Sequence, residues 1–327
     1  MSCSTRSFAI VTLAQIQQAR QRIAGIARHT PLLPFPSLDG APRLWLKLES
    51  FQPIGSFKLR GAYNKIASLG DAERARGVIT YSSGNHAQGV AYAARALGAP
   101  SVVVMPGNAP PVKIESTRAL GAEIVLVGPG SAERQEKAEA LARERGLAIV
   151  PPFNDEQIIA GQGTLALELL ADLPEVELVL VPIGGGGLVS GIAAALKLSG
   201  AKARVVGVEP ALAADAQQSF KSGTLAEWPA EKTTRTLADG LRTQSIGAIP
   251  FEHIREFVDD IVTVSEDEIR CAMRRLALEA RIIAEPSGAV TTAAALFHAA
   301  ELPRASRTVA VVSGGNVDPA LLAEVVR

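Results

Sequence analysis

Lys58 is the residue whose type and position best suit covalent chemistry. It lies in the run Ser56-Phe57-Lys58-Leu59-Arg60-Gly61-Ala62, where Ser56 is expected to cap a helix and to place Lys58 in its first turn. A cation at this end of a helix opposes the helix dipole. A lysine in such a place is more often a solvated side chain. The chemical interpretation is that the helix end, burial and a neighbouring bound group lower its pKa enough for imine formation.

Four consecutive glycines, Gly184, Gly185, Gly186 and Gly187, form a second chemical feature. They follow an apolar run at 178–181 and precede a helical pattern that starts at Leu188. Such a loop gathers backbone N–H groups at the positive end of a helix, a geometry that holds a phosphate. The loop lacks the Lys-Ser/Thr pair of nucleoside-triphosphate loops and does not match G-x-G-x-x-G, so a monophosphate fits best. The alternative is a flexible turn without a ligand.

The run Ser82-Ser83-Gly84-Asn85-His86 predicts a second anion site. It follows an apolar strand pattern and opens a helix, so hydroxyls and N–H groups converge on a target the size of a carboxylate. Asn85 has an amide that can donate to a phenolic oxygen. The alternative for the run 82–85 is an ordinary capped loop without a ligand, and the alternative for His86 is a structural role in place of a catalytic one.

The elements that position these residues follow from alternating apolar runs and helical patterns, which are typical of βα units with parallel strands. A capping box formed by Thr12 and Gln15 opens an N-terminal helix that runs to about residue 27. The pattern predicts two α/β lobes around a cleft, with the N-terminal helix packed on the second lobe. Strands are expected at Val78–Tyr81, 101–105, Glu123–Val127, 147–150, 177–181, 205–208 and Thr308–Val312, and further helices at 89–97, 112–120, Ser131–Arg145 and 188–197.

Composition excludes several classes of function. Lys plus Arg equals Asp plus Glu at 33 each, so no global charge attracts nucleic acid or an anionic membrane. No run reaches the roughly 18 apolar residues of a membrane span, and the N-terminus lacks a signal-peptide pattern. The two cysteines, Cys3 and Cys271, do not have metal-ligand spacing. The sequence therefore predicts a cytoplasmic protein without a nucleic-acid or membrane partner.

Five motifs in a fixed order carry a family resemblance. Together they resemble the fold-type II pyridoxal 5'-phosphate (PLP) enzymes, specifically the threonine/serine dehydratase and serine racemase group. The resemblance runs from His29 to Asp318 and includes Ala238-Asp-Gly-Leu-Arg242 and Val258-Asp-Asp-Ile-Val262. The motifs are Ser56-Phe-Lys-Leu-Arg-Gly-Ala62, Ser82-Ser-Gly-Asn-His86, Gly184-Gly-Gly-Gly187, Glu285-Pro-Ser-Gly-Ala289 and Ser313-Gly-Gly-Asn-Val-Asp318.

The resemblance implies a fold and an assembly. The expected fold class is a two-domain α/β fold like that of the tryptophan synthase β chain, each domain a mostly parallel twisted sheet with flanking helices. Residues 1–53 and 151–327 would form the large PLP-binding domain, and residues 54–150 the small substrate-binding domain. Family analogy alone implies a homodimer.

The resemblance also implies a role for each matching residue. Lys58 would carry PLP and move the α-proton, and Ser83 matches the second proton-transfer residue of the racemases. Ser313 would bind the pyridine nitrogen as a neutral hydroxyl, which makes the ring a weaker electron sink than an aspartate would. The other cofactor-binding residues would be Phe57, Asn85, Gly184, Gly185, Gly186, Gly187, Leu188 and Glu285, and the substrate carboxylate would be held by Ser82, Ser83, Asn85 and His86.

A divalent-cation site is implied at a different place. Glu209 and Asp215 would supply carboxylates and Ala213 its backbone carbonyl. An all-oxygen site suits Mg²⁺ or Ca²⁺ rather than zinc. Without the resemblance, two carboxylates near a strand end are more often solvated.

The leading functional prediction is PLP-dependent α,β-elimination from a small amino-acid substrate, L-threonine or L-serine, to a 2-oxo acid and ammonia. A 3-hydroxyaspartate dehydratase is an alternative, with Arg134 or Arg242 as the cation for the distal carboxylate. Racemisation, which needs Lys58 and Ser83 on opposite faces, is another, and both activities can coexist. β-Replacement is less favoured. A non-catalytic small-molecule-binding α/β protein is the alternative from a different class.

Overall fold

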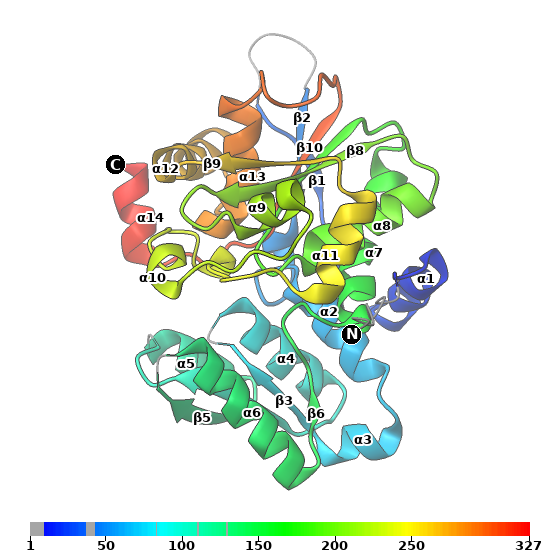
Figure 1. Cartoon of the computed structure of the whole chain (residues 1–327), viewed down its shortest axis with the longest axis vertical. Helices are drawn as coiled ribbons and strands as arrows, with labels where there is room; N and C mark the ends of the chain where they lie inside the picture. Colours follow the sequence, from blue (N-terminus) through cyan, green and yellow to red (C-terminus); the bar gives the residue numbers. More distant parts are fainter. Residues whose placement is uncertain (1–9, 37–42, 83, 110, 129) are drawn as a thin grey trace, which may run out of the picture.

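The computed structural model describes residues 10–36, 43–82, 84–109, 111–128 and 130–327. Within these residues the strands form two sheets, one in the upper and one in the lower part of Figure 1. All neighbouring strands are parallel except β1 and β2, which are antiparallel. The larger sheet has the order β1 (Leu32–Pro34), β2 (Leu44–Leu48), β10 (Thr308–Val312), β7 (Leu178–Pro182), β8 (Arg204–Pro210) and β9 (Asp260–Val264), and the smaller sheet the order β5 (Glu123–Val127), β4 (Ser101–Pro106), β3 (Val78–Tyr81) and β6 (Ala148–Ile149).

Helices connect the strands and cover both sheets (Figure 1). In the described residues they are α1 (Leu13–Arg22), α2 (Lys58–Ala67), α3 (Asp71–Arg76), α4 (Asn85–Ala96), α5 (Pro111–Ala119), α6 (Ser131–Arg145), α7 (Glu156–Asp172), α8 (Gly187–Leu198), α9 (Asp215–Ser222), α10 (Ala230–Thr233), α11 (Ala248–Phe257), α12 (Glu266–Arg275), α13 (Pro286–Phe297) and α14 (Pro319–Val326). Short 3-10 helices η1 (Glu49–Phe51) and η2 (Asp239–Leu241) and a π-helical turn, η3 (Leu276–Ala280), complete the set.

The larger sheet is buried on both faces because successive side chains of a strand point to opposite sides. Val179 and Val181 of β7 pack on one face with helices α7, α8 and α11. Leu178 and Leu180 pack on the other face with α12 and α13. The strand is therefore apolar throughout, which is why a continuous apolar run predicted it.

The smaller sheet is covered in the same way. Val102 and Val104 of β4 pack against Leu141 of α6, whereas Val103 and Met105 pack against Ala91 of α4. The carboxyl end of β3 leads into the start of α4, and the carboxyl end of β7 leads into the start of α8. Ligands of α/β proteins bind at such strand ends.

The N-terminal helix begins as predicted and ends earlier. Thr12 and Gln15 form the expected capping box. The helix stops at Arg22 rather than near residue 27, because the chain turns at Gly25, whose φ is +79°. Its inner face packs on α7 and α8, where Ile16 and Ala19 join the same apolar core as Ile159 and Ile192. The prediction that this helix packs on the second lobe is confirmed.

Three strands were not predicted from the sequence. They are β1, β2 and β9, and β2 contains a lysine, Lys47, whose side chain is completely buried. A charged residue interrupts the apolar run that would otherwise predict a strand. Within the described residues, no helix combines the length and apolar character that crossing a bilayer requires.

Candidate active site

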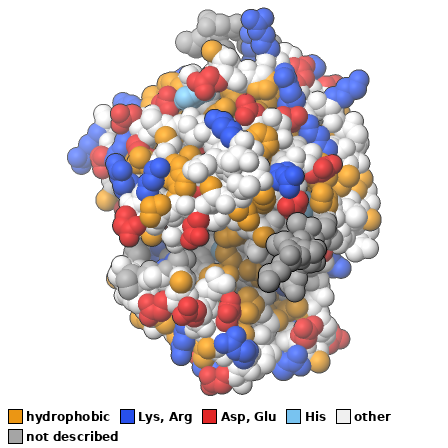
Figure 2. Space-filling model, viewed as in Figure 1, with side chains coloured by type: hydrophobic (Ala, Val, Ile, Leu, Met, Phe, Trp, Pro, Cys, Tyr) orange, Lys and Arg blue, Asp and Glu red, His pale blue; other side chains and the backbone are white. Residues whose placement is uncertain are grey.

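Segments far apart in the sequence meet at the carboxyl ends of the strands. Ser56 pairs with Gly314 in an isolated β-bridge, and the Phe57 N–H donates to the Ser313 carbonyl (3.1 Å). The Glu285 N–H donates to the Gly314 carbonyl (3.1 Å). Figure 2 shows a hollow between the upper and lower parts of the molecule. Three of the predicted motifs therefore share one site.

Lys58 begins helix α2, but Ser56 does not cap this helix. The N-cap residue is Phe57, and no side chain caps the helix. Among the described residues the Ser56 hydroxyl has no hydrogen-bond partner and is buried. The predicted Ser56 cap is wrong because Ser56 lies one residue before the N-cap, where the bridge to Gly314 holds its backbone.

The Lys58 amine lies in a partly buried position. Its Nζ donates to the carbonyl of Pro152 (2.9 Å) and lies 5.2 Å from the centroid of the Phe57 ring. Burial lowers the pKa of Lys58 to about 8, although Glu285 opposes this shift. An amine attacks an aldehyde only in its unprotonated form, so a lowered pKa favours imine formation near neutral pH.

We expect Lys58 to react with added PLP at a rate that rises with pH and levels off above about pH 8. Below this pH the amine is protonated and unreactive, whereas a lysine with the ordinary pKa of 10.5 would keep gaining reactivity to about pH 10. The appearance of the visible band of lysine-bound PLP, followed by stopped-flow absorbance in cofactor-free protein, gives this profile. A rate that still climbs tenfold per pH unit between pH 8 and 10 would contradict the lowered pKa.

The glycine loop has no room for side chains. A Cβ on Gly185 would lie 2.1 Å from the Phe153 ring, and one on Gly186, whose φ is +89°, would lie 2.7 Å from Pro250. In the described residues, no protein oxygen accepts a hydrogen bond from the N–H groups of 184–188. These donors lie at the positive end of α8, so the loop has the shape and the unpaired donors that a phosphate requires.

The loop is connected to Lys58 through a short segment. Phe153 packs on Gly185 and Gly187, and the preceding residue, Pro152, accepts the hydrogen bond from the Lys58 amine. Leu188 is buried in the first turn of α8. The predicted covalent residue and the predicted phosphate loop are thereby brought into one site.

Asn85 connects the start of α4 with Glu285 and Asn316. Its Nδ2 donates to Oε1 of Glu285 (2.7 Å), and its Oδ1 accepts from Nδ2 of Asn316 (2.7 Å). Burial raises the pKa of Glu285 to about 7, and Asp239 acts in the same direction. One N–H of the Asn85 amide remains for a ligand.

The His86 side chain lies in a buried position. Its Nε2 lies 3.0 Å from the carbonyl of Val150, and burial, with the nearby Lys58, lowers its pKa to about 3. The ring is therefore neutral, with Nε2 as the donor and Nδ1 left as an acceptor without a partner among the described residues. An acceptor cannot hold a carboxylate, so any substrate contact of this residue falls to its backbone N–H.

Of the two serines before Asn85, the structure describes Ser82 but not Ser83. The Ser82 hydroxyl accepts a hydrogen bond from the Gly84 N–H (3.3 Å). Ser83, the predicted second proton-transfer residue, lies outside the described residues. Ser313 is buried, and its hydroxyl donates to the Ser287 carbonyl over a long 3.4 Å. A bound acceptor at Ser313 would compete with this weak bond.

A buried charge cluster holds helix α2 from behind. The guanidinium of Arg60, two residues after Lys58, donates to both carboxylate oxygens of Glu49 (2.8 Å each) and of Glu168 (2.6 and 2.9 Å). Burial alone would raise the pKa of Glu49, but Arg60 outweighs it, so this pKa lies below its usual range. The cluster fixes the position of the helix turn that carries Lys58.

The predicted cation site lies away from Lys58. Glu209 and Asp215 are completely buried, and neither carboxylate oxygen of Asp215 has a hydrogen-bond partner among the described residues. Burial, together with Asp215, raises the pKa of Glu209 well above its usual range, and burial raises that of Asp215 to about 7. Glu209 accepts bonds from the N–H groups of Ala216 and Gln217 (3.0 and 2.7 Å). In the described part of the chain, no group of three or more His, Cys, Asp or Glu side chains forms a metal cluster.

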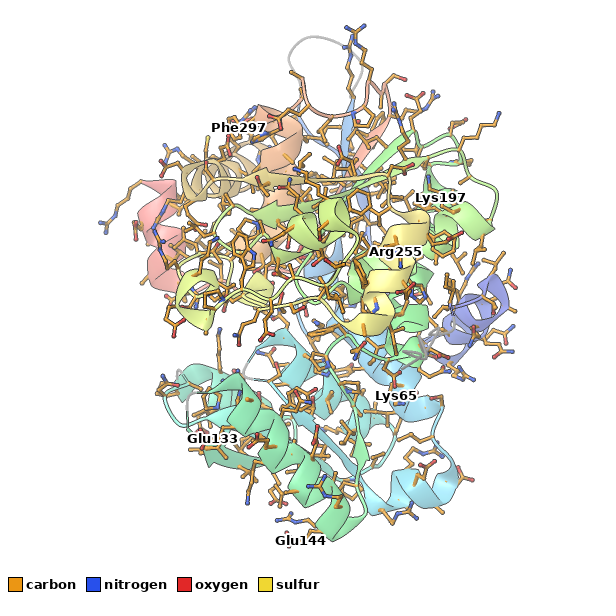
Figure 3. The ribbon with its side chains drawn as sticks, in the orientation of Figure 1. Lys65, Glu133, Glu144, Lys197, Arg255 and Phe297 are labelled. Atoms are coloured by element: carbon orange, nitrogen blue, oxygen red, sulfur yellow. The ribbon has the colours of Figure 1, made fainter. Side chains whose placement is uncertain are left out.

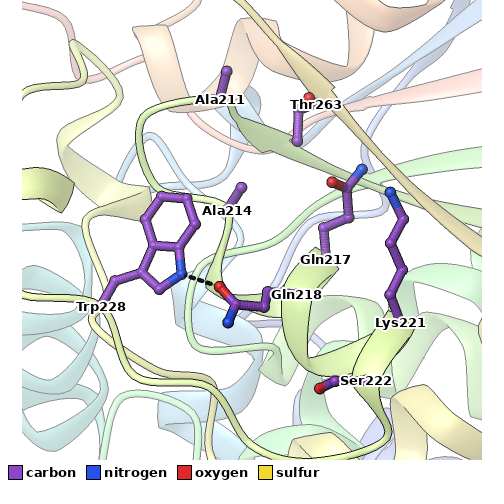
Figure 4. Close-up of a pocket in the computed structure, with 8 residues that line it drawn as sticks. All are labelled: Ala211, Ala214, Gln217, Gln218, Lys221, Ser222, Trp228 and Thr263. Atoms are coloured by element: carbon purple, nitrogen blue, oxygen red, sulfur yellow. Dashed lines mark hydrogen bonds between the residues drawn. The ribbon is translucent and has the colours of Figure 1, made fainter.

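A surface pocket of about 560 Å³ lies beside the segment between Glu209 and Asp215, and Ala211 and Ala214 of this segment line it (Figure 4). Its lining includes Gln217, Lys221 and Trp228, and the Trp228 indole N–H donates to Oε1 of Gln218 (2.6 Å). Lys58, the predicted catalytic residue that the structure describes, does not line this pocket, which therefore differs from the candidate active site.

Some residues of the site were missed in the sequence. Asp239 belongs to the motif at Ala238–Arg242, but the sequence did not indicate a function for it. Lys113, whose amine lies 2.8 Å from Asp239, was not predicted either, because an isolated lysine on a helix is usually solvated. The burial of Arg60, which belongs to the Lys58 motif, was not predicted. The combination of an arginine with apolar residues along α2 is the pattern that could have indicated its burial.

Comparisons with known proteins add independent findings. The model of a family described as pyridoxal-phosphate dependent enzyme matches residues 23–314. The chain is 39% identical to L-threo-3-hydroxyaspartate ammonia-lyase of Saccharomyces cerevisiae, with 94% of each chain covered. It is 42% identical to L-threonine ammonia-lyase of Thermotoga maritima, covering 94% of this chain and 76% of that protein. The structure resembles that of maize serine racemase with a TM-score of 0.91 and 37% identity, over 97% of each chain.

Proposed function

This chain belongs to the pyridoxal-phosphate dependent enzyme family, and from that premise we propose that it eliminates water from a small β-hydroxy amino acid, L-threonine or L-serine, to give a 2-oxo acid and ammonia. The observation that carries the proposal is the Lys58 amine of lowered pKa, connected through Pro152 and Phe153 to a glycine loop with unpaired N–H donors. Threonine and 3-hydroxyaspartate ammonia-lyases among the relatives support the reaction class.

The residues present fit PLP. Bound PLP supplies an electron sink for the charge left on Cα when the α-proton is removed. We propose that Lys58 attaches it, that the N–H groups of 184–188 hold its phosphate, and that Phe57 flanks its ring. Asn85 and Glu285 would lie at the phenolic oxygen side and Ser313 at the pyridine nitrogen. A neutral hydroxyl at Ser313 suits elimination, in which the negative charge passes quickly to the leaving group.

The chain's own groups would then bind and deprotonate the substrate. The start of α4, with Ser82, Ser83, Asn85 and His86, would hold the substrate carboxylate through hydroxyl and backbone N–H donors at the positive helix end. Lys58 would take the α-proton, because a pKa of about 8 leaves far more of its amine unprotonated near neutral pH than the ordinary value of 10.5 would. Racemisation would require a second proton donor on the opposite face, the role proposed for Ser83.

Assays of ammonia and 2-oxo acid test the proposed function. Purified protein loaded with PLP is offered L-threonine, L-serine and the stereoisomers of 3-hydroxyaspartate, and D-amino acid formation is followed in parallel. We expect 2-oxo acid and ammonia in equal amounts from at least one of these substrates. PLP-loaded protein that releases neither product from any of them would contradict the proposal, and exclusive D-amino acid formation would favour racemisation.

We further propose that Glu209, Asp215 and the Ala213 carbonyl bind Mg²⁺ or Ca²⁺. The support is that both carboxylates are buried and that neither oxygen of the Asp215 carboxylate has a hydrogen-bond partner among the described residues, whereas buried charges are normally paired or metal-bound. Oxygen ligands of this kind match the preference of either cation.

Removal of divalent cations with EDTA is expected to lower the thermal unfolding temperature. The two buried carboxylates would lose their counter-charge, and a cation present at 100 times its dissociation constant contributes about 2.7 kcal/mol. Differential scanning calorimetry with and without EDTA, followed by added Mg²⁺ or Ca²⁺, measures the effect. An Asp215→Asn variant should lose the response. An unfolding temperature that EDTA leaves unchanged would contradict the cation site.

The remaining predictions concern organisation. We propose residues 1–53 with 151–327 as a large domain and 54–150 as a small domain, supported by the separate sheets. A homodimer is supported by the exposed apolar side chains of Phe51 and Ile283, since Ser50 and Ile283 both lie beside Gly315. Analytical ultracentrifugation measures the oligomeric state of the protein in solution.

The cytoplasmic location stays a prediction that cell fractionation tests.

A further inference from the structure

An ion pair crosses the cleft between segments 126 residues apart. Nζ of Lys113, in α5, lies 2.8 Å from Oδ2 of Asp239, in η2. Both side chains are partly exposed, at 32% and 43%. The lysine therefore reaches from the smaller-sheet part of the molecule to the larger-sheet part, and its partner remains open to solvent and to ligands.

The turn that carries Asp239 packs directly on the candidate active site. A Cβ on Gly184 would lie 3.1 Å from the carbonyl oxygen of Gly240 and 3.3 Å from Cα of Leu241. The N–H of Gly240 also donates to the hydroxyl of Ser287 (2.9 Å), in the first turn of α13. Asp239 is thus held beside the glycine loop, and the Lys113 amine is held beside Asp239.

The charges of this pair act on the same site. Burial raises the pKa of Glu285, Asp239 raises it further, and Lys113 lowers it. Glu285 itself accepts a hydrogen bond from Asn85 at the start of α4. The ammonium of Lys113 therefore acts on Glu285, the hydrogen-bond partner of Asn85, which is proposed to contact both cofactor and substrate.

Arg242, one of the two arginines suggested by the sequence, is less well placed for an exchange of partners. Nε and Nη2 of Arg242 both donate to the carbonyl of Thr236 (2.9 and 2.6 Å), which fixes the guanidinium. By contrast, a partly exposed ion pair such as Lys113 with Asp239 contributes little stability, and an incoming carboxylate can replace one partner at little cost.

We propose that Lys113 binds the second carboxylate of a dicarboxylic β-hydroxy amino acid, of the 3-hydroxyaspartate class, and that Asp239 is its counter-ion when this substrate is absent. The inference rests on the proposed function and names its substrate class. The reaction is the same elimination: the Cα–H proton and the β-hydroxyl leave as water, and one water then releases ammonia, so that a 2-oxo dicarboxylate remains. Asp239 competes for the lysine and thereby sets the preference between monocarboxylate and dicarboxylate substrates.

The test is the ratio of kcat/KM for threo-3-hydroxyaspartate to kcat/KM for L-threonine. Lys113→Gln is expected to lower this ratio by about 10- to 100-fold, since a charge-assisted hydrogen bond to one substrate alone is lost. Lys113→Arg should keep the ratio within a few-fold, because the charge remains. Asp239→Asn should raise the ratio, because the competing carboxylate is gone.

Lys65→Gln is the matched control. Lys65 forms an ion pair of similar length with Asp155 (2.7 Å), at the end of α2 on the right of Figure 3 and away from α5. The same chemical change there should leave the ratio unchanged.

The outcomes separate this inference from the proposed function. Equal losses on both substrates in Lys113→Gln would mean that the pair only holds the two parts of the molecule together, and would overturn the inference. So would wild-type protein that deaminates threonine but not hydroxyaspartate. Protein that carries PLP yet deaminates neither substrate would instead overturn the proposed function. Thermal melts of each variant show that folding is retained.

Discussion

Lys58→Ala is expected to lower turnover by about 10³-fold or more while leaving the fold intact. The variant loses the group proposed to attach PLP and also the group proposed to take the α-proton, so one substitution removes two contributions. The helix turn should persist, because Phe57 is the N-cap and no hydrogen bond of the Lys58 side chain besides that to Pro152 is present in the described residues. Ammonia release and the visible absorption of lysine-bound PLP are the measurements.

Lys65→Ala is the control for this variant. It lies on the same helix, and its ion pair with Asp155 includes no residue proposed to bind PLP or the substrate. Its activity should stay within a few-fold of the wild type. If Lys58→Ala retained more than a tenth of the activity, Lys58 could not be both the attachment point and the base.

Arg60→Met should give the second large effect, on stability. The side chains of Arg60 and Glu49 have no exposed surface, and both carboxylate oxygens of Glu49 accept bonds from Arg60. Removing one partner leaves a buried charge uncompensated, which costs about 3–5 kcal/mol. Urea unfolding measures the loss of free energy of unfolding. Arg74→Met, which removes an exposed ion pair with Asp71, should cost less than about 1 kcal/mol.

The destabilisation should depend on pH with a defined sign. In the wild type the pKa of Glu49 is lowered, so the stability from this group is present above its unfolded pKa and is lost as the pH falls. In the variant, burial without Arg60 would raise this pKa, and the variant would lose stability as the pH rises. The difference between the two proteins should therefore narrow towards acid pH. A difference below about 1 kcal/mol at pH 7 would contradict the proposed cluster.

The regular part of the fold was predictable because buried parallel strands are apolar on both faces. The patterns at Val78–Tyr81, Glu123–Val127 and Thr308–Val312 predicted β3, β5 and β10 with the bounds observed. The predicted fold class, an α/β fold of the fold-type II PLP enzymes with mostly parallel sheets, is confirmed, and so is the family.

The features that the sequence did not predict depend on contacts between residues far apart in the chain. Lys47 can lie inside β2 because Glu168 (3.0 Å) and Asp172 (3.3 Å) of α7 reach its amine, and no local pattern indicates partners more than 120 positions later. The same holds in the site. Motifs located the loops around Lys58 and Asn85, but the contact of Asn85 with Glu285 spans 200 positions. The neutral state of the His86 ring follows from its burial and from the nearby Lys58, which the sequence does not specify.

Mapping the covalent attachment of PLP tests the central claim most directly. The protein is incubated with PLP, reduced with borohydride to make the lysine linkage permanent, digested, and analysed by mass spectrometry. We expect a single modified peptide with the added mass on Lys58. Modification of another lysine in place of Lys58, or protein that takes up no PLP, would contradict the account.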